Sequence, residues 1–281
     1  MKRRSLTLLL ALTLLLTACA SPKKEDAQTS AADLTVHFFD AGKADATLLT
    51  TADGAVLIDA GEKGFGKTIL AYLEEQGIER LDYLIVTHFD QDHVGGAAKV
   101  INNLAVGTVL QSNCPKDSEE YEKYCKALSN AGLEALTVRE NVTFTLGGAT
   151  VTVEPPRQTD YSEDESNNSS LIVTVENGTD SFLFLGDAQS ERLAEFLSSE
   201  RAACDVLKVA HHGQDEPLLS ELLAVTKPAY AVITSSDEEP ESAAVVEALE
   251  QCGASVLLTR EGAVTMHSTG DGITLDVSPA A

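Results

Sequence analysis

The sequence predicts an α/β fold in which two β-sheets pack together and helices cover their outer faces. Strands that pair as hairpins come first in the chain, and helices then alternate with apolar strands, twice over. Polar segments directly follow several of the apolar strands, and α/β folds place their functional residues at such strand ends. The same pattern therefore predicts a site that is assembled from several separate turns.

Hydrophobic periodicity identifies each element along the chain. Alternating apolar and polar residues predict strands, helical spacing predicts helices, and pairs such as Asp53-Gly54 predict the turns between them. In order, the predicted strands are 34–39, 46–51, 55–59, 81–87, 108–111, 136–139, 142–146, 150–154, 170–176, 181–185, 206–210, 230–234 and 255–259, before a terminal hairpin. The predicted helices are 68–76, 94–104, 119–130, 189–200, 217–225 and 241–251. The acidic stretch 155–168 has neither periodicity and is predicted to be a loop.

Residues 1–18 have the pattern of a signal peptide. A basic start precedes a short apolar run that ends at Cys19, in a sequence resembling a bacterial lipobox. We therefore expect cleavage before Cys19, acylation of that cysteine, and an exported, extracytoplasmic protein that is lipid-anchored to the bacterial membrane. An ordinary secretory peptide or an uncleaved anchor is the alternative. Residues 19–33 are expected to form a flexible tether, and residues 34–281 a single folded domain.

The chain is strongly acidic. Its formal net charge is −24, and removal of residues 1–18 would delete three positive charges and no acid, which leaves −27. Because nucleic-acid affinity depends on cations that neutralise phosphates, this charge counts against the binding of long nucleic acid. It also counts against adhesion to anionic lipid headgroups. Solubility is the ordinary explanation for such acidity.

Four cysteines lie beyond Cys19, namely Cys114, Cys125, Cys204 and Cys252. An exported chain can form disulfides, and the pairing Cys114–Cys125 with Cys204–Cys252 is favoured among the three possible pairings. Four free, partly buried thiols are an equally acceptable interpretation.

Segment 87–93 is the most informative feature of the chain. It places two histidines, His88 and His93, and two aspartates, Asp90 and Asp92, directly after an apolar strand. Four neighbouring nitrogen and oxygen donors exceed what a general acid and base require, and they suit one or two divalent metal ions. A metal ion at such an edge indicates hydrolysis by activated water.

Three further apolar strands also run into polar turns. These turns carry Asp59, Asp187 and the pair His211-His212. Taken singly, each turn has an ordinary explanation as a tight turn, a helix cap or a polar loop. Together with segment 87–93 they hold four of the six histidines in the chain, and this joint occurrence predicts one shared metal site.

Segment 87–93, followed by Gly95 and Gly96, resembles the signature loop of the metallo-β-lactamase superfamily. It is more narrowly similar to the hydrolase domain of ComEC-type DNA-uptake proteins and their exported relatives, in which an aspartate stands where Asp90 does. Four further segments resemble the remaining motifs of that subfamily and follow them in order and approximate spacing, namely 39–46, 167–171, 182–187 and 207–213. The resemblance covers roughly residues 34–277 and implies a four-layer αβ/βα sandwich with two divalent metal ions. Zinc is the expected metal, and manganese or iron are alternatives.

The resemblance also implies a role for each candidate residue. One metal would be held by His88 and Asp90 and the second by Asp92, His93 and His212, with Asp187 bridging the two ions. A proton relay by Asp92, or coordination of the leaving oxygen by a metal ion, would serve in place of a general acid. Asp59 would orient the loop through hydrogen bonds, and His211 would support a ligand or contact the substrate. Asn168 stands where many members carry a further histidine ligand, which weakens the first of the two sites.

Two departures from the subfamily pattern concern catalysis. Gln214 replaces a serine, and residues 235–240 replace a later Gly-His-Pro segment, which leaves no histidine beside the leaving group. The resemblance still implies a hydrolase in which a hydroxide shared by the metal ions attacks a small or polymeric phosphodiester. The alternatives are a hydrolase of other esters or lactones and a non-catalytic, metal-binding surface protein.

Overall fold

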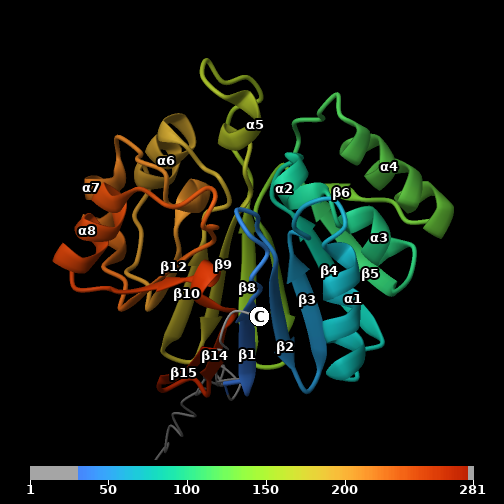
Figure 1. The fold of residues 1–281 in the computed structure, drawn as a ribbon, viewed down its shortest axis with the longest axis horizontal. Coiled ribbons are helices and arrows are strands. Elements are labelled where there is room, and N and C mark those ends of the chain that lie inside the picture. Colours follow the sequence, from blue (N-terminus) through green and yellow to red (C-terminus); the bar gives the residue numbers. More distant parts are fainter. Residues whose placement is uncertain (1–30, 278–281) are drawn as a thin grey trace, which may run out of the picture.

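Two β-sheets pack face to face at the centre of the molecule, and helices cover both outer faces (Figure 1). The computed structural model describes residues 31–277. The predicted signal peptide, Cys19 and most of the predicted tether lie outside these residues, as do residues 278–281. The order of layers, helices, sheet, sheet and helices, confirms the predicted four-layer sandwich.

The first sheet combines the N-terminal strands with the C-terminal hairpin. Its eight strands lie in the order β15 (Ile273–Val277), β14 (Val264–Ser268), β1 (Leu34–Phe38), β2 (Thr47–Thr51), β3 (Gly54–Ile58), β4 (Arg80–Val86), β5 (Ala105–Gln111) and β6 (Leu136–Thr137). Strands β3, β4 and β5 run parallel, whereas β14 closes on β1 in the antiparallel direction.

The second sheet is formed by the middle of the chain. Its seven strands lie in the order β13 (Ser255–Leu258), β12 (Tyr230–Ile233), β11 (Val206–Lys208), β10 (Asp180–Phe184), β9 (Ile172–Asn177), β8 (Ala149–Glu154) and β7 (Val142–Leu146). Strands β10 to β13 run parallel, and β7 to β10 are antiparallel neighbours.

Helices divide between the two outer faces. The first sheet is covered by α1 (Gly66–Glu75), α3 (Ala97–Ile101) and α4 (Glu119–Ala131), with the short α2 (Gln91–Val94) at its edge. The second sheet is covered by α6 (Ser190–Leu197), α7 (Leu219–Thr226) and α8 (Ala243–Gln251). The remaining turns are α5 (Glu165–Asn168) and the 3₁₀ turns η1 (Ala210–Gly213) and η2 (Thr259–Glu261).

Three apolar layers hold these elements together. Between the sheets, side chains such as Phe38 and Ile85 meet Phe182 and Phe184 in one buried cluster. Two further clusters join each sheet to its own helices. Buried apolar area is the main favourable term in folding, so this arrangement fixes the strand ends from which the site is built.

The structure differs from the sequence predictions around the site. The helix predicted at 94–104 is divided into α2 and α3 at Gly95-Gly96. A Cβ atom on Gly96 would lie 2.1 Å from the carbonyl oxygen of Ala60, so only glycine allows segment 87–93 to pack this closely on the neighbouring turn. The predicted loop 155–168 also contains α5, a single helical turn.

Two other expectations concern the cysteines and the membrane. Cys114, Cys125, Cys204 and Cys252 are all free thiols, so the favoured disulfide pairing is wrong. Cys204 is buried under α7, where a partner would have to replace apolar packing. Within residues 31–277, no helix has both the length and the apolar character that crossing a membrane requires.

Candidate metal centre

The predicted site residues lie where the ends of two pairs of parallel strands meet. In the first sheet, β3 and β4 are followed by Asp59 and segment 87–93. In the second sheet, β10 and β11 are followed by Asp187 and His212. Because parallel strands end at the same edge of a sheet, turns that are distant in the sequence converge here.

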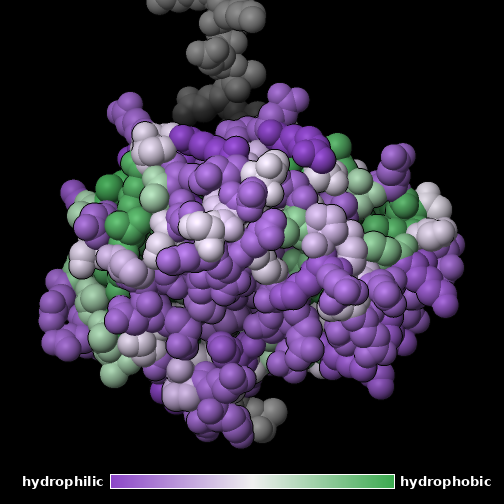
Figure 2. Space-filling model, turned by 90° about the horizontal axis from the view of Figure 1, so that it is seen from above, coloured by the Kyte–Doolittle hydropathy of each residue, from purple (hydrophilic) through white to green (hydrophobic). Residues whose placement is uncertain are grey.

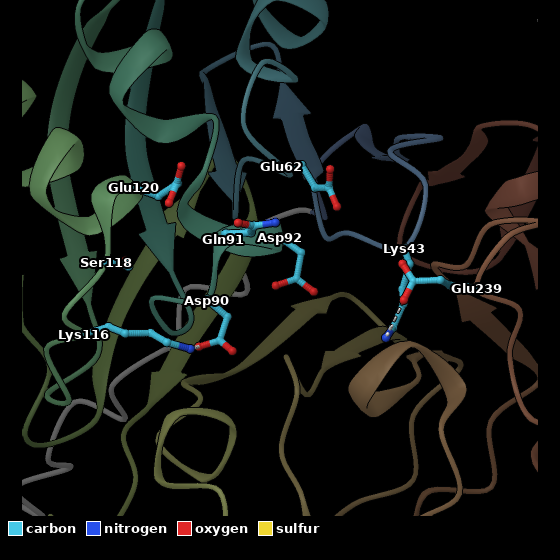
Figure 3. Close-up of a pocket in the computed structure, with 9 residues that line it drawn as sticks. All are labelled: Lys43, Glu62, Asp90, Gln91, Asp92, Lys116, Ser118, Glu120 and Glu239. Carbon is cyan, nitrogen blue, oxygen red and sulfur yellow. Dashed lines mark hydrogen bonds and ion pairs between the residues drawn. The ribbon is translucent and has the colours of Figure 1, made fainter.

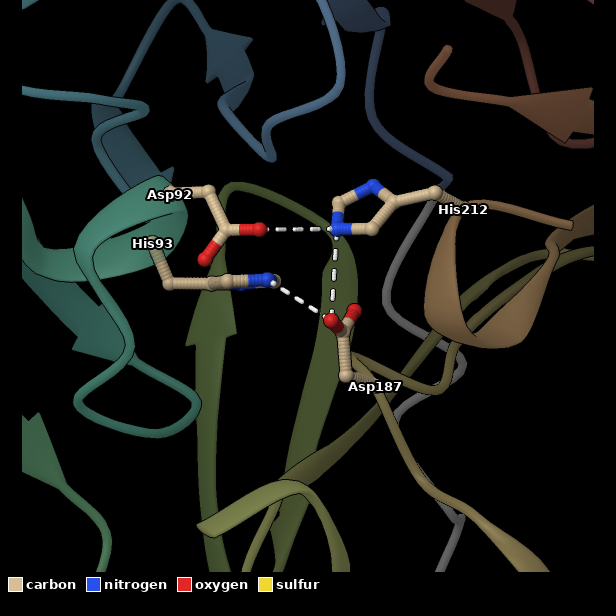
Figure 4. A group of neighbouring side chains, drawn as sticks. All are labelled: Asp92, His93, Asp187 and His212. Atoms are coloured by element: carbon tan, nitrogen blue, oxygen red, sulfur yellow. Dashed lines mark ion pairs between the residues drawn. The ribbon is translucent and has the colours of Figure 1, made fainter. Parts of the chain in front are cut away.

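Asp92, His93, Asp187 and His212 form a compact cluster, called the four-residue site below (Figure 4). One donor atom of each lies within 4.8 Å of the others. Oδ2 of Asp187 lies 3.2 Å from Nε2 of both His93 and His212, and Oδ2 of Asp92 lies 3.3 Å from Nε2 of His212. Three of these side chains are buried, and Asp92 is 25% exposed.

Several donor atoms of the four-residue site are buried without a hydrogen bond. Among residues 31–277, Nε2 of His93, Nε2 of His212 and Oδ1 of Asp187 have no hydrogen-bond partner. The ion-pair contacts above are close but are not aligned as hydrogen bonds. Buried polar atoms are normally satisfied, so these atoms call for a ligand. Two imidazole nitrogens and two carboxylates fit a divalent transition-metal ion.

The supporting hydrogen bonds orient both histidines of the four-residue site. Nδ1 of His93 lies 2.9 Å from Oδ2 of Asp59, and Nδ1 of His212 lies 3.1 Å from the carbonyl oxygen of Thr234. Both partners only accept hydrogen bonds, so Nδ1–H donates in each case and the Nε2 lone pair is left for a cation.

Charge in the four-residue site favours cations strongly. Burial alone would lower the pKa of His212, but the carboxylates of Asp187 and Asp92 outweigh it and raise that pKa to about 9. The pKa of His93 is likewise raised well above its usual value, since Asp187 and Asp59 outweigh burial. Burial opposes ionisation of Asp187, yet the two histidines hold its pKa well below the usual range. In the metal-free protein, protons therefore take the place of a cation.

His88, Asp90 and Asn168 form the other side of the centre, called the His88 side below. Nε2 of His88 is buried without a partner among the described residues, and it lies 4.0 Å from Oδ1 of Asp90. That Asp90 oxygen accepts hydrogen bonds from Lys116 Nζ and Ser166 Oγ.

Asn168 does not face the centre. Its Nδ2 donates to the carbonyl oxygen of Glu163 at 2.7 Å, and its Oδ1 accepts from the backbone N–H of Arg192 at 3.0 Å. Within the described residues, His88 belongs to no group of three His, Cys, Asp or Glu donor atoms that all lie within 4.8 Å. The residues of the four-residue site thus fit a resident ion, and those of the His88 side do not.

Asp59 and His211 lie beside the centre. Asp59 accepts hydrogen bonds from the backbone N–H and the hydroxyl of Thr87, at 2.8 and 2.7 Å, in addition to that from His93. His211 contacts Gln189 and Glu216 through Nδ1, at 3.1 and 3.2 Å. The φ angles are positive, 56° at Asp59, 49° at His211 and 53° at His212, a conformation that is uncommon outside glycine although Asp and His adopt it more often than most residues. Such backbone strain clusters at functional sites.

Asp45 and Lys208 were missed by sequence reasoning. Both are buried, and the Lys208 ammonium contacts Oδ2 of Asp45. Oδ1 of Asp45 accepts a hydrogen bond from Thr234 at 2.6 Å and lies 3.5 Å from Nδ1 of His212. Burial opposes ionisation of Asp45, but Lys208 and the histidines hold its pKa below the usual value. A charged residue within an otherwise apolar predicted strand was the available signal for Lys208.

An open cavity of about 360 Å³ lies in front of the centre (Figure 3). Asp90 and Asp92 line it, and Lys116 and Lys43 are its two cationic residues. The remaining lining residues are Glu62, Gln91, Ser118, Glu120 and Glu239. The cavity can admit a small substrate to the exposed carboxylate of Asp92, while the mainly acidic lining disfavours an extended polyanion.

The sequence of this chain is similar to those of known proteins. Residues 39–235 match the family model described as the metallo-beta-lactamase superfamily. The chain is 29% identical over 170 residues to ComE operon protein 3 of Bacillus subtilis (strain 168), a match that covers 60% of this chain and 22% of that protein. It is 27% identical over 210 residues to Recombination protein 2 of Haemophilus influenzae, covering 73% of this chain and 24% of that protein.

A solved structure has the same fold. The metallo-beta-lactamase fold protein YhfI from Bacillus subtilis matches with a TM-score of 0.55 at 10% identity, covering 87% of this chain and all of that chain. In contrast, this chain spans only about a quarter of the length of the two relatives above.

Proposed function

The chain belongs to the metallo-β-lactamase superfamily, and on that premise we propose that it is a metal-dependent hydrolase of phosphodiesters. One observation carries the proposal: four nitrogen and oxygen donors converge, several without hydrogen-bond partners among residues 31–277, behind a cavity open to solvent. A catalytic metal site has this form, with protein ligands on one side and open positions on the other.

The residues of the four-residue site and the residues that support them have separate tasks in this proposal. Asp92, His93, Asp187 and His212 hold the ion, for which zinc is expected and manganese or iron are alternatives. When bound, the ion supplies Lewis acidity toward the substrate and lowers the pKa of water. Asp59 and Thr234 keep Nε2 of the two histidines directed at it. Asp92 reaches the cavity and can take up a proton from water, because the nearby imidazoles of His212 and His93 outweigh burial and keep its pKa low.

Similarity and charge together support small phosphodiesters as the substrates. The similarity to ComE operon protein 3 and Recombination protein 2 motivates a phosphate ester. The net charge of −24 counts against long nucleic acid, and so does the mainly acidic lining of the cavity. The face of the molecule seen from above is mostly hydrophilic (Figure 2). Lys43 and Lys116 offer positive charge to a single phosphate group.

The place of action is also a proposal. A signal peptide and an acylated Cys19 would hold the domain at the outer face of the bacterial membrane, through the tether that ends at residue 33. Labelling with radioactive palmitate, lost in Cys19→Ala, would test the anchor. Unchanged labelling of that variant would remove Cys19 from this role.

A substrate panel tests the activity. The protein, loaded with Zn²⁺ or Mn²⁺, is offered bis-p-nitrophenyl phosphate, short DNA, a lactone and nitrocefin. We expect phosphodiester cleavage that a chelator abolishes and added metal restores. Hydrolysis of the lactone or nitrocefin alone would contradict the substrate class. Metal binding without any turnover would favour a non-catalytic, metal-binding surface protein.

A further inference from the structure

A lysine ammonium, that of Lys116, lies on the His88 side, where the resemblance places the first of the two metal ions. Lys116 Nζ and Ser166 Oγ both donate to Oδ1 of Asp90, which is the carboxylate expected to bind the first metal together with His88. Lys116 comes from the loop between β5 and α4, and its side chain is 38% exposed along the cavity wall. The ammonium thus lies beside the donors that a second metal would need.

The remaining donor of the His88 side is committed elsewhere. Asn168 bonds the backbone at Glu163 and at Arg192, and Arg192 is itself a fully buried arginine that donates to the carbonyl oxygens of Ser170 and Glu154. Turning the Asn168 amide toward His88 would leave the buried N–H of Arg192 without its acceptor. The packing of α5 against α6 therefore keeps Asn168 away from the centre.

Electrostatic repulsion also disfavours a second ion on the His88 side. A divalent ion bound by His88 and Asp90 would lie within a few ångströms of the Lys116 ammonium and would compete with it for one carboxylate. Like charges at that separation repel strongly in a partly buried site. His88 alone supplies a single donor atom, its Nε2.

From these contacts we propose that the protein holds one resident divalent ion, in the four-residue site, and that the Lys116 ammonium replaces the second ion. The role of Lys116 toward the substrate rests on the proposed function. Lys116 and the resident ion flank the same phosphate group, and Lys116 donates hydrogen bonds to the oxygens of that group. A lysine acts here as a compact charge with three donors on a flexible stem, so it can leave Asp90 when the phosphate arrives.

Metal stoichiometry tests the first part without any activity. Protein equilibrated with excess Zn²⁺ or Mn²⁺ and freed of unbound ion is analysed for metal per chain. We expect one ion in the wild type and in Lys116→Met. Two ions are expected in Lys116→Glu, because a carboxylate at position 116 would join His88 and Asp90 as a third donor. The position is partly exposed, so neither change threatens the fold.

Two tightly held ions in the wild type would overturn the proposal. A single ion in both the wild type and Lys116→Glu would show that Lys116 is not what excludes the second ion, and would overturn its assigned role.

Phosphodiester kinetics test the second part. Lys116→Met should lower kcat/KM for bis-p-nitrophenyl phosphate by about 100-fold, the scale found when one donor to a developing charge is removed. The matched control is Lys123→Met, which removes a lysine of α4 that does not line the cavity and that forms an exposed ion pair with Glu119 at 2.6 Å. Its loss should stay below about fivefold, because exposed pairs contribute little.

Equal losses of kcat/KM in the two variants would show that Lys116 has no particular role toward the phosphate, and would overturn this part of the proposal. If the wild type cleaves no phosphodiester at all, the proposed function fails, whereas the metal content of the wild type and Lys116→Glu still decides how many ions the centre holds.

Discussion

The four-residue site and the His88 side receive donors from the same loop, yet they differ in what stands behind the donors. In the four-residue site, Nδ1 of His93 donates to the Asp59 carboxylate. Nδ1 of His212 lies 3.1 Å from the Thr234 carbonyl and 2.9 Å from the Thr234 hydroxyl, whose proton is donated to Asp45, so both of these oxygens accept. On the His88 side, Nδ1 of His88 lies 3.2 Å from the Thr87 hydroxyl, whose proton is donated to Asp59, and 3.4 Å from the Ser170 hydroxyl, which can either donate or accept.

In the one-ion proposal, supporting contacts, more than the donors themselves, decide which half holds the ion. A histidine whose tautomer is fixed presents a lone pair to the metal, and one beside a hydroxyl that can donate, as Ser170 can, is able to present a proton instead. Asp90 and Asn168 follow the same logic, since their oxygens are already occupied by Lys116 and by the backbone of α6.

The largest effect is expected from Asp187→Asn, because Asp187 contacts both histidines of the four-residue site. Metal affinity should fall by more than about 100-fold, beyond the loss typical of a supporting residue. Metal analysis after dialysis measures this, with the exposed Asp276→Asn as the matched control. Unchanged metal content would remove Asp187 from the ligand set.

The pH response of the metal-free protein contrasts the two halves directly. The pKa of His212 is raised from 6.5 to about 9, whereas that of His88 is lowered by burial and by His93. Because the folded-state pKa of His212 exceeds its unfolded value, its contribution to stability is complete below pH 6.5 and is lost as pH rises through about 9. Each pKa unit corresponds to about 1.4 kcal/mol.

We therefore expect the melting temperature of the chelator-treated protein to decrease as the pH is raised from 6.5 to about 9. NMR titration of the histidine Cε1–H signals should show a group with the raised pKa that is missing in His212→Gln, while His88 stays neutral near pH 7. A metal-free protein that becomes more stable over this interval would contradict the assignment.

Asp59→Asn should weaken only the four-residue site. The asparagine keeps the size of the side chain and tolerates the φ of 56°, but its charge is lost and its amide can donate to Nδ1 of His93. We expect metal affinity to fall by about 10- to 100-fold, measured by competition with a chromophoric chelator. Affinity equal to that of the wild type would show that His93 needs no fixed tautomer.

The fold and the four-residue site could be predicted from the sequence because both depend on local pattern. Strand periodicity identified the elements, and the motifs after β4, β10 and β11 identified Asp92, His93, Asp187 and His212, which the topology brings together. The resemblance to the metallo-β-lactamase superfamily and to ComEC-type proteins is confirmed by the family match and by the named relatives.

The His88 side could not be predicted in this way, because its state depends on contacts between loops. Lys116 reaches Asp90 from 26 residues away, from a polar loop without periodicity. Asn168 is turned aside by the N–H of Arg192, 24 residues along the chain. A sequence motif identifies the metal-donor residues, but it does not show which of their atoms are occupied by hydrogen bonds to neighbouring residues. The split of helix 94–104 is similar, since it depends on the carbonyl of Ala60.

Asp90→Asn should have the smallest effect on the resident ion, although Asp90 and Asp92 are close neighbours in the same loop. The Asp90 oxygen is bonded to Lys116 and Ser166 and lies outside the four-residue site, so metal affinity should change by less than the tenfold at which supporting residues begin to matter. The chelator competition used for Asp59→Asn measures both variants on one scale. If Asp90→Asn lost its ion as readily as Asp59→Asn, the ion would have to bind on the His88 side, and the difference between the two halves would vanish.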